Sequence, residues 1–415
     1  MTDATQHGDF RRLARESLSY APDMVVEKWR SQVSGLTVLW ANFDSPLLNA
    51  YITVATEIFN DSGVPHTLEH LVFLGSDQYP YKGVLDSLAN RAFAQGTNAW
   101  TANDHTAYTL TTAGSDGFLR MLPVYCDHVF YPTLTSDGFV TEVYHVNGKC
   151  EDAGVVYSEM QGRENSSADL VELKTQRMLY PPTSGYRSET GGLMSALRVL
   201  TIDEIRKYHA QYYVPHNTAL VLCGPLDRAK LFATLAEIDA RLVAKQSAHG
   251  ELGLAGWKRP FMETPSAVPP VINGAQLQQP GVDDAEVPAR GTLSAERRYV
   301  SIEFPERDES VGDVQVSFVG PTLDEHLKLQ ALDVLGTYLS DSTVSPLQQA
   351  FVERDHPLCT DIYITNNERA GASVISIAFS SVPTKELDVL DTEFVRVLRD
   401  VAEHIDMQRM RTVLR

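Results

Sequence analysis

Cysteine is scarce in this sequence. The four cysteines, Cys126, Cys150, Cys223 and Cys359, lie far apart and form no CxxC pair. In a chain of 415 residues this number is too small for a disulfide-stabilised scaffold. We therefore expect reduced thiols, as in a cytosol-like compartment.

Long hydrophobic runs are missing as well. No apolar stretch approaches the roughly 20 residues that a membrane-spanning helix needs. Residues 1–21 lack the apolar core of a secretory signal, and their arginines are mixed with acidic residues, which transit peptides avoid. We therefore expect no membrane association and a cytoplasmic location, with a mitochondrial location as the alternative.

Positive charge is in the minority. The chain has 35 lysines and arginines against 54 acidic residues, which gives a formal net charge of −19. A protein that binds nucleic acid needs a basic surface to contact the phosphates, so we expect no nucleic-acid partner.

Short strands and helices are predicted throughout residues 36–223. Two apolar runs, 36–40 and 47–56, are broken by Asp44-Ser45-Pro46 and predict two strands joined by a turn. Pro65 and Gly75 are placed to begin and end a helix. Further along, the pattern predicts helices at 84–93, 117–130, 155–179 and 202–213, and strands at 98–101, 106–111 and 218–223.

A stretch rich in proline and glycine, residues 246–297, predicts a linker or a long surface excursion. We expect it to separate two related domains, residues 1–245 and 298–415, because the order of elements repeats after it. Each domain would be a β-β-α-α-β-β-α unit of an α+β fold, with an antiparallel-rich sheet and helices. The chain ends in a helix just begun, so we expect the second domain to be incomplete. Its predicted strands are 299–304, 314–318, 361–365 and 373–379, and its predicted helices are 324–339, 345–353 and 385–404.

The strongest chemical signal is the segment Pro65-His66-Thr67-Leu68-Glu69-His70. Residues i and i+4 share one face of a helix, so His66 and His70 can bind the same metal ion. Glu69 lies on the same side, within reach of a water on that metal. Two imidazoles and a carboxylate suit zinc, with the fourth position left to water. Standing alone, the pattern fits two surface histidines on a partly buried helix equally well.

The third ligand has to come from another part of the chain. Spacing alone does not choose among the acidic residues downstream, because most acidic side chains are simply solvated. The candidates are Glu142, Glu151, Asp152, Glu159 and Glu164.

Three segments resemble the pitrilysin–insulysin family of zinc peptidases, whose inverted HxxEH motif is that of the inverzincins. The segments are Gly63 to Ser76 around the histidines, Gly96-Thr97-Asn98-Ala99-Trp100-Thr101, and Gly154-Val155-Val156-Tyr157-Ser158-Glu159-Met160-Gln161-Gly162. The last segment, and its spacing from His70, are most similar to the presequence-protease branch. The chain is similar to the N-terminal half of such a protein only.

This resemblance implies the roles of individual residues in a zinc-dependent endopeptidase. His66, His70 and Glu159 would bind Zn²⁺, and Glu69 would be the general base for the attack of a metal-bound water on the scissile carbonyl. Many relatives carry a second acid seven residues before the third ligand. That residue is Asp152 here, and it would support a histidine ligand by a hydrogen bond. The backbone of an unfolded peptide would pair with Asn98, Ala99, Trp100 and Thr101.

Single-chain members of this family are about twice as long, and their second half closes a chamber over the zinc. We therefore expect a C-terminal half or a partner chain to complete the active enzyme. The alternative is a non-catalytic structural or assembly subunit of the same family, and such subunits typically lose motif residues. His66, Glu69, His70 and Glu159 are all present here, which favours the peptidase.

Overall fold

The computed structural model describes residues 5–248, 257–262 and 299–414. These residues form two compact units, each with its own hydrophobic core. Unit 1 comprises residues 1–164 and 188–262, and unit 2 comprises residues 165–187 and 263–415. The short stretch 165–187 therefore packs with the C-terminal part of the chain.

Unit 1 is built on an eight-stranded sheet with the strand order β1-β2-β3-β4-β10-β5-β7-β6. Neighbouring strands are antiparallel except β4 and β10, which run parallel. This sheet confirms the predicted α+β fold with antiparallel-rich sheets. The strands are β1 (Gln6–His7), β2 (Phe10–Leu18), β3 (Ala21–Ser31), β4 (Thr37–Asn42), β5 (Leu47–Ala55), β6 (Asn98–Thr101), β7 (His105–Ala113) and β10 (Thr218–Cys223).

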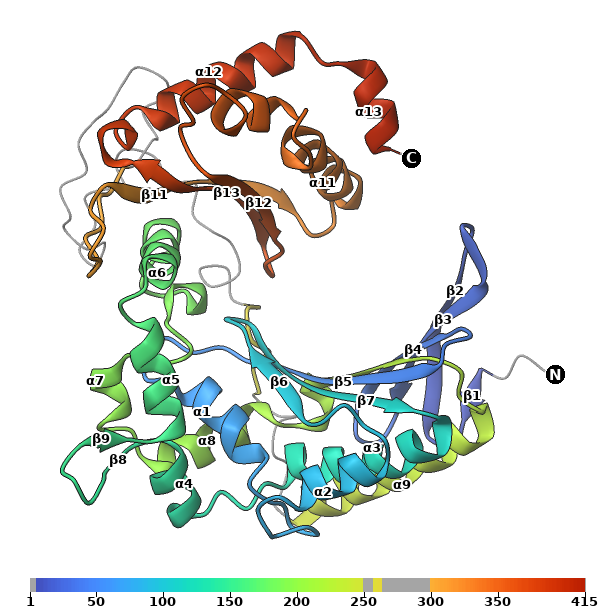
Figure 1. The fold of residues 1–415 in the computed structure, drawn as a ribbon. Coiled ribbons are helices and arrows are strands. Elements are labelled where there is room, and N and C mark those ends of the chain that lie inside the picture. The colour runs from blue at the N-terminus through green and yellow to red at the C-terminus, as the bar shows by residue number, and fades with distance from the viewer. Residues whose placement is uncertain (1–4, 249–256, 263–298, 415) are drawn as a thin grey trace. The chain divides into compact units, whose positions relative to one another are not determined.

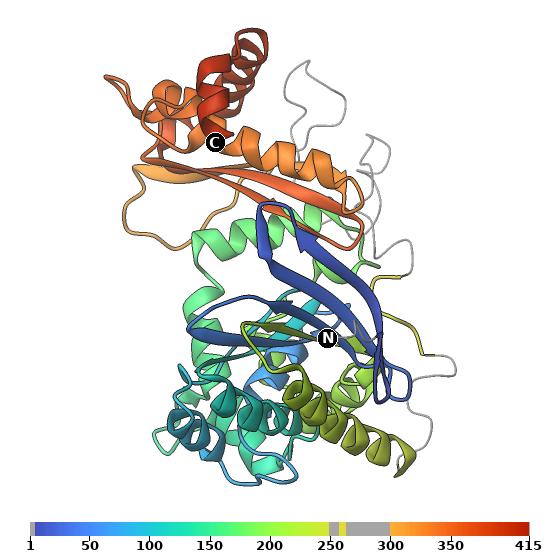
Figure 2. The ribbon, with the colours of Figure 1, turned by 90° about the vertical axis from the view of Figure 1, so that its right-hand side faces the viewer.

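Helices cover one face of this sheet. In β5 the side chains of Leu48, Ala50, Ile52 and Val54 are buried, while the residues between them are partly exposed, as expected for a strand with one covered face. Figures 1 and 2 show α3 (Ser115–Phe130) and α9 (Arg228–Ala248) on the covered side. The other helices and short strands of unit 1 are α1 (Val64–Val72), α2 (Val84–Arg91), α4 (Ser136–Glu142), β8 (His145–Val146), β9 (Asp152–Ala153), α5 (Val155–Arg163), α7 (Met194–Leu197), α8 (Ile202–Tyr212) and the 3₁₀ turn η2 (Pro215–Asn217).

The two strands predicted at 36–40 and 47–56 form, but they are not neighbours. β10 lies between β4 and β5 and pairs with both through residues 218–223. β10 is a central strand whose backbone groups pair on both edges, and nothing in the sequence indicates that a strand from residues 218–223 enters between two strands joined by a short turn.

Strands β1 to β3 were not predicted at all. Their core-facing positions are not uniformly apolar, because Glu27 is buried on β3 and faces Arg12 and Arg15 of β2. A search for alternating hydrophobic residues misses a strand that places an ion pair in the core.

Unit 2 has a three-stranded antiparallel sheet with the order β11-β13-β12. In its core the ring of Phe379 lies 5.2 Å from Phe351 and 5.4 Å from Phe394. The strand predicted at 299–304 is not formed, and those residues have no regular structure. Unit 2 contains α6 (Ser167–Leu179), η1 (Gly185–Arg187), β11 (Val311–Thr322), α11 (His326–Ser340), the π-helical turn η4 (Gln348–Val352), β12 (Asp361–Asn367), β13 (Ala372–Pro383), η5 (Thr384–Glu386), α12 (Leu390–Glu403) and α13 (Met407–Val413).

The helix predicted over 155–179 is two helices, α5 and α6. Ser166 begins the second one, since its hydroxyl accepts a hydrogen bond from the backbone N–H of Asp169. The break separates the two units, because α5 belongs to unit 1 and α6 to unit 2.

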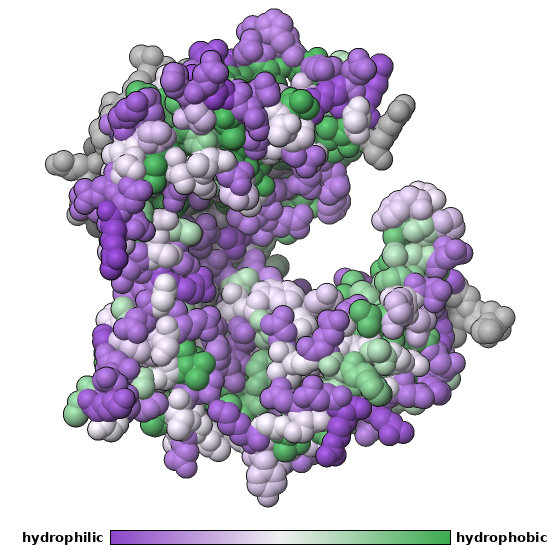
Figure 3. Space-filling model, viewed as in Figure 1, coloured by the Kyte–Doolittle hydropathy of each residue, from purple (hydrophilic) through white to green (hydrophobic). Residues whose placement is uncertain are grey.

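Most of the predicted linker, 246–297, lies outside the described residues. The predicted domain boundaries and the incompleteness of the second domain stay predictions. Within the described ranges, no helix is both long and apolar enough to cross a membrane. On the face shown in Figure 3, hydrophobic residues form separate areas and no continuous band.

Candidate metal centre

Helix α1 carries the two histidines of the HxxEH motif. Pro65 lies in its first turn, where a missing backbone N–H costs nothing. Leu68, Leu71 and Val72 are fully buried and fix the helix against the core of unit 1. His66 and Glu69 are also buried, which is unusual for polar side chains and brings both into a low-dielectric site.

Gly63, immediately before α1, has to be glycine. Its φ of 74° is left-handed, and a Cβ at this position would lie 2.6 Å from the carbonyl oxygen of Gly191 and 2.8 Å from the Cα of Gly192. The N-terminus of α1 is therefore packed directly against the backbone of residues 191–192.

The structure brings His66, His70 and Glu159 together. One ligand atom from each lies within 4.8 Å of the others, and no other group of three such side chains is found among the described residues. Glu159 comes from α5, which packs against α1. This juxtaposition agrees with the ligand set that the resemblance implied. Metal binding itself stays a prediction.

The distances between these atoms fit a tetrahedral zinc site. Zinc ligands at 2.0–2.1 Å from the ion are separated from each other by about 3.3–3.4 Å in a tetrahedron. The Nε2 atoms of His66 and His70 are 3.2 Å apart. The carboxylate of Glu159 lies 3.6 Å from the Nε2 of His66 and 3.5 Å from the Nε2 of His70. The three side chains therefore have the separation that one shared zinc ion requires.

Glu142, at the end of α4, supports His70 from the other side of the ring. Its Oε1 is 3.3 Å from the Nδ1 of His70, and its Oε2 is 3.4 Å from the Nζ of Lys82. A carboxylate that accepts the Nδ1–H leaves the lone pair of Nε2 free for a metal ion. Glu142 was one of five acidic candidates for the third ligand, and spacing gave no sign of this role.

Asp152 does not take the position that the resemblance gave it. Its carboxylate accepts hydrogen bonds from Tyr144 at 2.8 Å, Tyr157 at 2.9 Å and Arg198 at 2.8 Å. It makes no hydrogen bond to His66 or His70 among the described residues. Asp152 fixes the start of α5 to α7, and Glu142 is the acid that contacts the Nδ1 of His70.

The surroundings shift the protonation of the motif residues. Burial, and then the charge of His70, lower the pKa of His66 to about 4, so its ring is neutral at physiological pH. Burial disfavours the charged form of His70, but the hydrogen bond to Glu142 and the charges of Glu69 and Glu159 outweigh it and raise the pKa of His70. Burial raises the pKa of Glu69 against the opposing hydrogen bond from Thr101. A carboxylate with a raised pKa is suited to act as a general base.

The predicted substrate strand, β6, is an edge strand of the sheet beside α1. Thr101 donates a hydrogen bond of 2.5 Å from its hydroxyl to Glu69. Trp100 is 42% exposed, and its indole N–H donates to His105 at 3.0 Å. His105 in turn contacts Asp104 at 2.7 Å. The outer edge of β6 therefore lies next to Glu69, the predicted general base, while pairing with a substrate stays a prediction.

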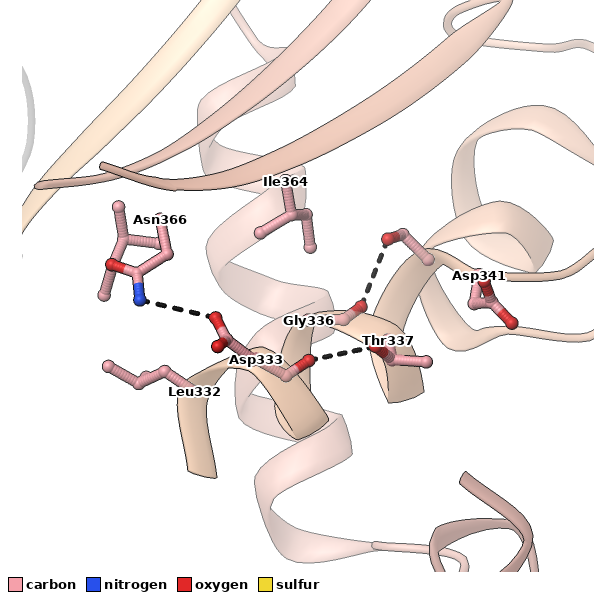
Figure 4. Close-up of a pocket in the computed structure, with 9 residues that line it drawn as sticks. Leu332, Asp333, Gly336, Thr337, Asp341, Ile364 and Asn366 are labelled. Atoms are coloured by element: carbon pink, nitrogen blue, oxygen red, sulfur yellow. Dashed lines mark hydrogen bonds between the residues drawn. The ribbon is translucent and has the colours of Figure 1, made fainter. Parts of the chain in front are cut away.

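Unit 2 contains a cavity of about 310 Å³ between α11 and the strands β12 and β13. Asn366 points to Asp333 across it and donates a hydrogen bond of 3.3 Å (Figure 4). The hydroxyls of Thr337 and Ser340 donate to carbonyls of their own helix. Its polar groups are thus largely occupied, and its lining contains no histidine or cysteine.

Family models match most of the chain. Residues 55–165 match the model described as Insulinase (Peptidase family M16), and this range includes all four motif residues. Residues 200–415 match the model described as Peptidase M16 inactive domain.

Individual relatives agree with these matches. The chain is 35% identical over 415 residues to "Uncharacterized protein YOL098C" of Saccharomyces cerevisiae, covering 98% of this chain and 36% of that protein. It is 24% identical over 356 residues to "Presequence protease, mitochondrial" of Gibberella zeae, covering 82% of this chain and 31% of that protein. The chain thus spans about a third of the length of the curated relatives it matches.

Solved structures show the same fold. A protease from Helicobacter pylori superimposes with a TM-score of 0.69 at 20% identity, covering 94% of this chain and 83% of that chain. Pitrilysin superimposes with a TM-score of 0.63 at 14% identity, covering 97% of this chain and 39% of that chain.

Proposed function

The chain belongs to peptidase family M16, and from this premise we propose that it is the zinc-binding part of an endopeptidase that hydrolyses unfolded peptides. The observation that carries the proposal is the arrangement of His66, His70 and Glu159 at the separations of a tetrahedral zinc site. Glu69, a buried carboxylate on the same helix face, supplies the base that hydrolysis requires.

Each residue has a distinct part in this proposal. His66, His70 and Glu159 hold the zinc ion, and Glu142 fixes the ring of His70. A zinc ion bound there would supply Lewis acidity toward the scissile carbonyl and toward water. Glu69 takes a proton from the attacking water and passes it to the leaving amine, a role worth roughly 10²–10⁴-fold in rate. The hydroxyl of Thr101 holds the carboxylate of Glu69 in place.

The edge of β6 selects extended substrates. A peptide that adds to this edge as a further strand satisfies the free backbone groups of residues 98–101 and presents its own backbone beside Glu69. Folded proteins cannot offer such a free strand, so we propose that unfolded peptides are the substrates. A C-terminal half or a partner chain would close the site around them, and the cytoplasm is the proposed location.

The test is cleavage of an unstructured, internally quenched peptide by the zinc-loaded chain, with Glu69→Gln measured alongside. We expect both proteins to bind one zinc ion, and any cleavage to be confined to the wild type. His66→Ala and His70→Ala should each lose zinc. Cleavage by Glu69→Gln at the wild-type rate would contradict the assigned base.

The second candidate function, a non-catalytic subunit of the same family, predicts a different result. The match to the inactive-domain model covers residues 200–415, which include none of the four motif residues. Intact motif residues that bind no zinc would favour this candidate. Bound zinc without cleavage would keep the metal centre and assign the completion of the enzyme to a further chain or segment.

A further inference from the structure

The uncovered face of the large sheet in unit 1 has an ordered set of side chains. Directly paired residues in a sheet point to the same face, so the strand registers define rows that run across the strands. Trp100 begins one such row, and Asn98 begins the next, on the face opposite to Thr101 and the helices. The first row continues through Ala107, Thr53, Ala219, Thr37, Arg30 and Arg11, and the second through Thr109, Tyr51, Val221, Leu39, Lys28 and Ala14.

Three cations lie together at the far end of these rows. Arg11 and Arg30 are direct cross-strand partners on β2 and β3, and Lys28 lies two residues from Arg30 on the same face. All three side chains are exposed, and none forms an ion pair or hydrogen bond with another described side chain. We call Arg11, Lys28 and Arg30 the basic cluster.

The basic cluster is unexpected on grounds of stability. Like charges directly opposite each other in a sheet are destabilising, and this chain has 54 acidic residues that could neutralise them. The acidic residue nearest in register on this face, Glu16 opposite Val26, forms no ion pair with Lys28. Other arginines of the same strands do have partners, since Arg12 and Arg15 contact Glu27 on the covered face. The basic cluster thus retains free positive charge in a strongly acidic protein.

The basic cluster lies on the same sheet as the edge strand, at a distance that a short peptide can span. Five strand-to-strand steps separate β6 from β3, and six separate it from β2. At about 4.8 Å a step, these distances are roughly 24 and 29 Å. An extended peptide advances about 3.4 Å a residue, so about seven to nine residues cover them. Small, uncharged residues lie along the path, where Thr53, Ala219 and Thr37 are partly exposed and Ala107 is buried.

We propose that the basic cluster binds carboxylate groups of the peptide substrate, about seven to nine residues away from the segment that pairs with β6. This inference rests on the proposed function, since it uses the same edge strand. Because β6 has only four residues, a longer peptide has to leave it, and the part that crosses the open face reaches the cations. The carboxylates are acidic side chains or the C-terminal carboxylate, which present the same chemistry to arginine and lysine.

The experiment measures binding and not turnover. Labelled peptides are titrated by fluorescence polarisation into the zinc-loaded Glu69→Gln chain, so that none is cleaved. All four peptides share one reacting segment, and the first three end in an amide. Positions are counted from the end of the reacting segment. The first peptide has glutamates at positions seven to nine, and the second has three glutamates directly next to the reacting segment. The third has glutamines at positions seven to nine. A fourth peptide has glutamines and a free C-terminal carboxylate at position nine.

The variant combines Arg11→Gln, Lys28→Gln and Arg30→Gln, and the matched control combines Arg91→Gln, Arg120→Gln and Lys207→Gln. The control residues are exposed cations on α2, α3 and α8. Both proteins have the same net charge, since −19 − 3 = −22. Removal of the like-charge pair should not lower the melting temperature of the variant, which separates a binding defect from unfolding.

We expect the peptide with distal glutamates to bind about threefold to thirtyfold tighter than the glutamine peptide. The gain should vanish in the basic-cluster variant, persist in the control and shrink as salt rises from about 0.05 to about 0.5 M. A smaller gain for the free carboxylate would show that the C-terminus also binds.

Several results would overturn the inference. The first is equal affinity for the peptides with distal glutamates and with glutamines. The second is a gain in affinity that survives in the basic-cluster variant. The third is an equal gain from glutamates next to the reacting segment, which would indicate a general polyanion surface. Failure of the proposed function is distinguishable, because a wild type that cleaves no peptide can still show the distal gain. Absence of binding by every peptide would reject both proposals.

Discussion

At the scale of single residues, the candidate centre depends on which acid contacts which histidine. Glu142 and Asp152 are both near the motif in the fold, yet their partners differ completely. Glu142 is buried and faces His70, whereas Asp152 is held by two tyrosines and Arg198. We therefore predict that Glu142, and not Asp152, affects zinc affinity.

Replacing Glu142 with Gln should weaken zinc binding about 10–100-fold, because the ring of His70 loses the carboxylate that fixes its tautomer and orientation. The dissociation constant for zinc, measured by competition with a chromophoric chelator, checks this. Asp152→Asn is the matched control and should leave the zinc affinity unchanged. The opposite order of effects would restore the role that the resemblance gave to Asp152.

The sequence predicted one part of the centre from physics alone. The spacing of His66 and His70 places both imidazoles on one helix face, and this requires no knowledge of the rest of the chain. The choice of Glu159 came from resemblance, since it depends on how α5 packs against α1. The role of Glu142 could not be predicted, because it depends on where the end of α4 lies relative to His70.

At the scale of elements, β2 and β3 are joined to α9 by a buried carboxylate. Glu27 of β3 lies 3.4 Å from Arg12 and 3.7 Å from Arg15, both on β2. It lies 2.9 Å from Arg228 of α9, and the indole N–H of Trp29 donates to it at 3.1 Å. This network explains how strands with few apolar residues are held in the sheet, and why alternation of hydrophobic residues did not reveal them.

Glu27→Gln should destabilise unit 1 by about 2–4 kcal/mol at pH 7, since it leaves the arginines without their anion. Burial alone would raise the pKa of Glu27, but hydrogen bonds from Arg228 and Trp29 and the charges of Arg228 and Arg12 lower it. A carboxyl with a lowered folded pKa stabilises above its unfolded pKa, and this stability is lost as the pH falls through the folded value. The difference between wild type and variant in urea unfolding should therefore shrink below about pH 4.5.

Glu16→Gln is the control for this change. Glu16 lies on the neighbouring strand and is exposed. Its replacement removes the same charge, so it should change the free energy of unfolding by no more than about 0.5 kcal/mol. If Glu27→Gln lost as much stability in acid as at neutral pH, packing and not charge would explain the loss.

At the scale of the whole molecule, the chain folds into two units whose cores are separate. The segment 165–187 lies in the sequence between two stretches of unit 1, but it belongs to unit 2. Two hydrogen bonds join it to the rest of unit 2. Ser167 donates to Asp313 at 2.8 Å, and Thr175 accepts from Gln315 at 3.1 Å. The sequence suggested one helix over 155–179, because both halves have helical composition. The cap at Ser166 marks the point where the chain leaves unit 1.

All three candidate ligands lie in unit 1, so zinc should stabilise that unit selectively. We expect two thermal transitions in differential scanning calorimetry after chelation of metal. Free zinc at about a thousand times its dissociation constant should stabilise unit 1 by about 4 kcal/mol. For a unit of this size, this raises the midpoint temperature of its transition by about 10 °C. The other transition should not move.

Phe394→Ala assigns the two transitions, because Phe394 is fully buried in the core of unit 2. The lost side chain should cost about 3–5 kcal/mol and lower only the transition that does not respond to zinc. His66→Ala should leave both transitions in place and abolish the zinc response. A zinc response in the transition that Phe394→Ala lowers would show that the units unfold together, and that the separate cores do not make them independent in stability.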